Sequence, residues 1–125
     1  MAQVPCPSKR TTNSWMKSYQ SVWEEQALDY ENFPEWYRVW CLAVARGQQN
    51  GHSGFPPGEI ARRLGRPDSQ GGWIPKAPSG VSQAISSAKR KGLLDRDSNS
   101  RCLVLPNHAW SGGLGSPFKI CPVHG

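Results

Sequence analysis

Residues 78–92 read Pro-Ser-Gly-Val-Ser-Gln-Ala-Ile-Ser-Ser-Ala-Lys-Arg-Lys-Gly, and they set the interpretation of the whole chain. The pattern predicts a helix over residues 79–91. Ser79 is expected to be its N-cap, because a serine hydroxyl accepts a hydrogen bond from an unpaired amide of the first turn. Gly92 is expected to end it in the left-handed conformation. Apolar residues recur at helical spacing and predict one face that docks on a core: Val81, Ala84, Ile85 and Ala88.

The opposite face of this helix is polar and carries no acidic residue. Its side chains are short hydrogen-bonding groups and one guanidinium: Ser82, Gln83, Ser86, Ser87 and Arg90. A face that only meets solvent more often carries Glu–Lys pairs. The composition is therefore typical of a recognition helix that reads nucleic acid.

The charge balance also indicates a nucleic-acid partner. The chain has 125 residues, enough for one domain, and a formal net charge of +6. Residues 51–105 hold nine Lys and Arg against four Asp and Glu, whereas residues 14–33 hold one Lys against four acids. The basic surplus thus lies around the predicted recognition helix. Ordinary surface charge that keeps the protein in solution is the alternative explanation.

The N-terminal part is expected to be an arm followed by an aromatic helix. Residues 1–13 are polar and predict a flexible arm. Residues 14–33 predict a helix with an aromatic stripe, which would pack on the core or form an interface: Trp15, Tyr19, Val22, Trp23, Ala27 and Tyr30. Through Trp15, Tyr19 and Trp23 this helix would join a homodimer or bind a host protein.

Two further helices are expected before the polar-faced one. Residues 34–49 are apolar nearly all round and predict a buried central helix, in which Cys41 is a core residue. The loop 50–54 contains His52, to which no role is assigned. Residues 57–64 predict a third helix that ends at Gly65. The thirteen residues 66–78 then form a long loop, held in place by Trp73 and Ile74.

A β-hairpin is expected after Gly92. Residues 93–94 and 101–105 predict two short strands around the polar tip 95–100, and Pro106 ends the second strand. Arg96 and Arg101 would flank this tip, where they could touch phosphates.

Cysteines and histidines in the last part of the chain predict a metal site. Cys102, His108, Cys121 and His124 follow the spacing Cys-x5-His-x12-Cys-x2-His, and two thiolates with two imidazoles suit tetrahedral Zn²⁺. A closed structural zinc site would tie the glycine-rich tail, residues 106–125, to the strand that carries Cys102. The alternative is that Cys102 is a core residue and the tail is frayed.

The chain resembles winged helix-turn-helix DNA-binding proteins. The resemblance is carried by Gly58-Glu-Ile-Ala-Arg-Arg-Leu-Gly65, by Val81-Ser-Gln-Ala-Ile85 and by Gly92-Leu-Leu94. The tail from Arg101 through Cys121-Pro-Val-His124 is similar to that of small helix-turn-helix proteins encoded by actinobacterial phages. The resemblance covers residues 34–125 and implies DNA binding in a bacterial host cytoplasm, usually as a regulator.

The expected fold is therefore mainly α with a small β-hairpin. It comprises a winged helix-turn-helix domain at 34–105, an extra N-terminal helix and a zinc-braced tail. Duplex DNA is the expected partner, and no apolar run is long enough for a membrane span. Base contacts are assigned to Ser82, Gln83 and Ser86, and phosphate contacts to Lys89, Arg90, Lys91, Arg62, Arg63, Arg96 and Arg101. Ser79 is also assigned to the DNA-binding surface.

Two other function classes remain open on the sequence alone. One is a small phage-type protein that binds a host protein, such as transcription machinery, through the aromatic helix. The other is an enzyme, which is disfavoured: four candidate ligands close the metal sphere, and no carboxylate lies between Arg101 and Gly125.

Overall fold

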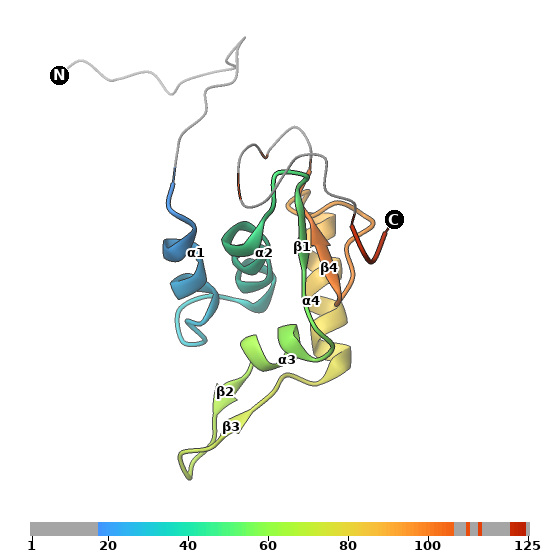
Figure 1. The fold of residues 1–125 in the computed structure, drawn as a ribbon. Coiled ribbons are helices and arrows are strands. Elements are labelled where there is room, and N and C mark those ends of the chain that lie inside the picture. The colour runs from blue at the N-terminus through green and yellow to red at the C-terminus, as the bar shows by residue number, and fades with distance from the viewer. Residues whose placement is uncertain (1–17, 107–109, 111–112, 114–120, 125) are drawn as a thin grey trace, which may run out of the picture.

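A computed structural model describes residues 18–106, 110, 113 and 121–124 (Figure 1). In these residues the fold is helical with two small two-stranded sheets. The elements follow the order α1 (Gln20–Ala27), α2 (Glu35–Arg46), β1 (His52–Gly54), α3 (Glu59–Arg63), β2 (Arg66–Pro67), β3 (Trp73–Ile74), α4 (Pro78–Arg90) and β4 (Cys102–Val104). The arm at 1–13 and most of the tail lie outside the described residues.

Helix α4 matches the helix predicted over residues 79–91. Its apolar stripe is buried, namely Val81, Ala84, Ile85 and Ala88. Gly92 has a φ of 75°, as expected of the residue that ends the helix. The N-cap prediction is wrong: Ala77 occupies that position, without a side-chain cap, and Pro78 opens the helix. Proline suits the first turn because its missing N–H is not needed there.

Helix α2 is the buried centre of the molecule. Val39, Cys41 and Leu42 are fully buried, and the cluster around them includes side chains of α3, α4 and β4. Cys41 is a core residue, as predicted, and burial raises the pKa of its thiol to about 11. The helix ends at Arg46 rather than near residue 49, because Gly47 has extended backbone angles.

Helix α1 packs along α2 but is shorter than the predicted helix. The indole rings of Trp23 and Trp40 meet edge to face at 5.2 Å, and Ala27 is fully buried. The helix ends at Ala27, so Tyr30 is outside it, and Tyr19 precedes it with 82% of its surface exposed. The predicted stripe therefore holds at Trp23 and Ala27 and is wrong at Tyr19, Val22 and Tyr30, which are exposed. Residues 14–17 lie outside the described part.

A buried arginine connects three helices. Only 3% of Arg38 is exposed, and its guanidinium donates to the carbonyls of Ala27 (2.8 Å), Arg63 (2.9 Å) and Leu64 (3.3 Å). These carbonyls belong to the C-terminal ends of α1 and α3, which lack helical N–H partners. Arg38 thus fixes both helix ends against α2.

The predicted hairpin after Gly92 does not form as expected. Strand β4 pairs antiparallel with β1, so that His52 faces Val104 and Gly54 faces Cys102, and residues 93–94 are not a strand. Leu94 is instead buried in the core. The segment 95–101 folds back on β4 through Ser98, whose hydroxyl accepts from the Val104 N–H at 2.8 Å. The strand that pairs with β4 is therefore β1, and the predicted loop 50–54 contains this strand at residues 52–54.

The long loop at 66–78 contains a hairpin of its own. Arg66 faces Ile74 and Pro67 faces Trp73 in the β2–β3 pair, which projects away from the other elements (Figure 1). The Trp73 indole N–H donates to the Arg62 carbonyl at 2.8 Å, so this tryptophan does hold the loop, as predicted. Among the described residues, no helix has the length and apolar character needed to cross a bilayer.

Candidate metal centre and polar helix face

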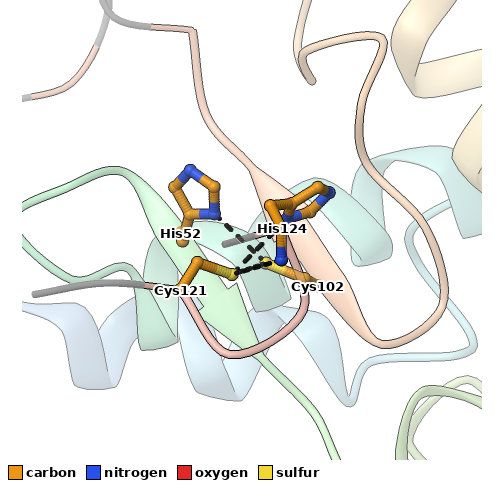
Figure 2. A group of neighbouring side chains, drawn as sticks. All are labelled: His52, Cys102, Cys121 and His124. Atoms are coloured by element: carbon orange, nitrogen blue, oxygen red, sulfur yellow. Dashed lines mark hydrogen bonds between the residues drawn. The ribbon is translucent and has the colours of Figure 1, made fainter.

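Four side chains meet where the last residues of the chain lie against the β1–β4 sheet. His52 comes from β1, Cys102 from β4, and Cys121 and His124 from the short turn at 121–124 (Figure 2). Their ligand atoms all lie within 4.8 Å of one another, close enough to hold a metal ion. The β1–β4 pairing creates half of this group, because Cys102 lies opposite Gly54, two residues from His52.

The distances within the group are short and even. The Cys102 Sγ atom is 3.4 Å from His52 Nδ1 and 3.6 Å from Cys121 Sγ. Cys121 Sγ is in turn 3.4 Å from His124 Nδ1. The two cysteines are free thiols in this structure rather than a disulfide, and both are buried.

His124 is oriented by a second contact outside the group. Its Nε2 atom lies 2.8 Å from the carbonyl oxygen of Asp97, in the turn that folds back on β4. A carbonyl can only accept, so Nε2 carries a proton. In the protonated ring Nδ1 donates to the Cys121 sulfur, and in the neutral ring it holds a lone pair that faces that sulfur. Metal-binding histidines are commonly held in this way.

The two thiols differ in acidity. Burial, followed by the nearby Cys121 sulfur, raises the pKa of Cys102 to about 12. Burial also opposes ionisation of Cys121, but hydrogen bonds from His124 and the Val123 backbone outweigh it and lower the pKa of Cys121 to about 6. The Cys121 hydrogen bond and the Asp97 carbonyl raise the pKa of His124. Without a metal, Cys121 is therefore the thiolate and Cys102 the thiol.

Three of the four predicted ligands come together here: Cys102, Cys121 and His124. The fourth predicted ligand, His108, lies outside the described residues. His52, which sequence reasoning left without a role, occupies the remaining corner. The spacing of cysteines and histidines near the C-terminus does not reveal His52, because it is 50 residues from Cys102 and meets it only through strand pairing.

The second candidate site is the exposed face of α4. The side chains of Ser82, Gln83, Ser86, Ser87 and Arg90 line a common surface depression. Ser82, Gln83 and Ser86 are exposed, and Arg90 donates to the Ser87 hydroxyl at 2.9 Å. Ser79, in the first turn, is exposed as well. The structure therefore presents to solvent the four uncharged side chains of this helix that the sequence assigned to DNA binding.

The basic residues assigned to phosphate contacts fall into two groups. Arg63 pairs with Glu24 at 2.7 Å, and Arg101 donates to the Phe55 carbonyl at 3.0 Å, so both bind their own chain. In the second group, Arg62, Arg90, Lys91 and Arg96 are exposed. Two of these also have a partner in the protein: Arg62 pairs with Glu59 at 2.7 Å, and the Lys91 ammonium lies 4.7 Å from the Trp36 ring centre. Lys89 is half-buried.

Comparison with known proteins returns no match for this chain, whether with family models, curated proteins or solved structures.

Proposed function

We propose that the protein is a sequence-specific regulator that binds double-stranded DNA with α4 in the major groove. The observation that carries this proposal is the acid-free polar face of α4, which is exposed at Ser82, Gln83, Ser86 and Arg90 while the opposite face is buried. Burial of the apolar stripe fixes which side chains point outward. A fixed row of short hydrogen-bonding groups with a terminal arginine fits the edges of base pairs.

The order of elements supports a winged helix-turn-helix arrangement. Helix α4 packs on α2, α3 packs on α4, and strands β1 and β4 pair with each other. The turn 95–101 then takes the place of the wing tip, with Arg96 exposed on it. In such a fold the second helix of the pair is the one that enters the groove.

Individual roles follow from exposure. Gln83 is the strongest candidate for base reading, because its amide can pair with both hydrogen-bonding groups of adenine, and Ser79, Ser82 and Ser86 flank it. Phosphate contacts fall to the exposed Arg62, Arg90, Lys91 and Arg96, joined by Lys89. Arg63 and Arg101 would first have to leave their partners within the protein.

A selection of random duplexes by the purified protein tests this function. We expect one enriched motif, and its symmetry reports whether one or two copies bind. On that motif, Gln83→Ala should cost about 1–3 kcal/mol, with little change on random duplex as the internal control. No enrichment would refute DNA reading, and equal losses on both duplexes would refute the role of Gln83.

We further propose that the four-residue group binds structural Zn²⁺. With Zn–S near 2.3 Å and Zn–N near 2.0–2.1 Å, a regular tetrahedron has S–S edges of about 3.8 Å and S–N edges of about 3.6 Å. The corresponding distances here are 3.6 Å, 3.4 Å and 3.4 Å. Four protein ligands leave no open position for substrate, so the site would connect the tail to β1–β4 and have no catalytic role.

Elemental analysis of two matched variants tests this site. We expect about one zinc per chain in the wild type, its loss in His52→Ala and its retention in His108→Ala. Less than about a tenth of an equivalent in the wild type would refute zinc binding. If zinc is lost in His108→Ala and retained in His52→Ala, the fourth ligand is His108 and not His52.

A second candidate function is binding of a host protein, or of a second copy, through α1. The observation that favours it is a group of exposed apolar side chains on α1 and directly before and after it: Tyr19, Val22, Leu28 and Tyr30. Tyr19→Ser with Val22→Ser should abolish such binding and leave DNA binding unchanged. Sedimentation of the wild type and this variant separates a dimer from a monomer.

A further inference from the structure

The β2–β3 hairpin exposes large apolar side chains, which are expected to be covered in a hairpin that binds no partner. All four strand residues are exposed, including Trp73 at 46% and Ile74 at 45%. Within the described part of the chain, Arg66 makes no ion pair. Two-stranded hairpins are marginally stable when uncovered, so this one needs other support.

That support comes from its two ends. At the tip, the Asp68 carboxylate accepts from the Gly72 N–H at 2.7 Å and from the Gln70 N–H at 2.9 Å. At the root, the Trp73 ring lies on the backbone of Gly65, where a Cβ atom would come within 2.5 Å of the indole nitrogen. The hairpin is thus held in a fixed direction, and its one carboxylate is engaged with its own backbone.

The hairpin is rooted beside the first turn of α4. Strand β3 ends at Ile74 and α4 begins at Pro78, and four residues span at most about 14 Å. The major groove of B-DNA is about 12 Å wide, and its phosphate rows lie on either side. With the first turn of α4 in the groove, the hairpin lies within reach of a flanking phosphate row.

We infer that the β2–β3 hairpin is a second DNA-contacting element, in which Arg66 binds a backbone phosphate and Trp73 and Ile74 pack on the adjoining sugars. The inference rests on the proposed function and extends it. Charge favours an anionic partner over a basic or apolar one, and in the proposed function that partner is DNA: Arg66 is exposed, Arg62 is 58% exposed, and the Asp68 carboxylate is engaged. Arg66 and Arg96 then lie beyond opposite ends of α4 and reach opposite flanks of the site.

Binding of Arg66→Gln to the selected duplex tests the inference. Loss of one phosphate contact should weaken affinity about fivefold at 0.15 M salt on specific and random duplexes alike, and reduce the salt slope by about 0.9. Trimming ~5 base pairs from one flank should remove the difference between wild type and Arg66→Gln. The matched control, Arg96→Gln, should keep its defect on that trimmed duplex and lose it when the other flank is trimmed.

The outcomes separate the hairpin from the function on which it rests. If the wild type binds no duplex, both proposals fail. If the wild type binds and Arg66→Gln binds equally well with an unchanged salt slope, the hairpin inference alone fails. Equal melting temperatures of the two proteins, expected because Arg66 is exposed, exclude unfolding as the cause of a loss.

Discussion

The two small sheets of this protein have the same pairing and opposite surroundings. In β1–β4 every residue of β4 is buried, between the helical core on one side and the Cys/His group on the other. In β2–β3 every residue is exposed, and only the tip and the root are held. The difference indicates that β1–β4 contributes to stability, whereas β2–β3 has side chains free for a partner.

The largest effect is expected from Leu103→Ala in β4. Leu103 is fully buried in the main core, and removing a buried leucine side chain leaves a cavity. The free energy of unfolding should fall by about 2–5 kcal/mol, measured by urea denaturation. A loss below about 1 kcal/mol would show that the core does not depend on this strand and would contradict the contrast between the sheets.

Removal of the proposed zinc ion should have the next largest effect. A metal that binds only the folded chain adds about 2.7 kcal/mol of stability when its free concentration is 100 times its Kd. Chelator should therefore lower the melting temperature of the wild type. The zinc-free Cys102→Ala variant is the control and should melt at the same temperature with and without chelator, as calorimetry can show.

Zinc affinity should also depend on pH in a defined direction. The pKa of Cys102 is raised to about 12, so its thiol must lose a proton when metal binds, whereas Cys121, with a pKa of about 6, is already a thiolate at pH 8. Loss of one proton weakens apparent affinity about tenfold for each pH unit of acidification. The dependence should steepen toward the acid end of the range, where Cys121 and His124, whose pKa is raised, also take up protons. Competition with a coloured chelator from pH 6 to 9 measures both slopes.

The sequence predicts the helices better than the sheets, for a physical reason. The stripe of α4 and the apolar character of α2 follow local periodicity, which packing then confirms. The partner of β4 is β1, whose residues precede their pairing partners by 48 (Gly54–Cys102) to 52 (His52–Val104) positions, and no local pattern encodes such a pairing. The predicted hairpin therefore had the right second strand and the wrong first one.

The candidate metal site shows the same division between local and distant information. The Cys121-x2-His124 pair can be predicted from the sequence because its two ligands lie on one turn. Cys102 can be predicted because it lies in an expected strand. His52 depends on the β1–β4 register, so it was missed. The buried Arg38 was missed as well, because its partners are backbone carbonyls, which have no signature in the sequence.

The smallest effect on stability is expected from Ile74→Ala, the counterpart of Leu103→Ala in the exposed hairpin. Ile74 is 45% exposed, and the hairpin is held by the Trp73 indole and the Asp68 carboxylate rather than by this side chain. The free energy of unfolding should change by no more than about 0.5 kcal/mol in urea denaturation. Both substitutions remove aliphatic carbons from a strand, so comparing Leu103→Ala with Ile74→Ala isolates the effect of burial on stability. A loss near that of Leu103→Ala would mean that something packs on β3 in solution and that its surface is not free for DNA.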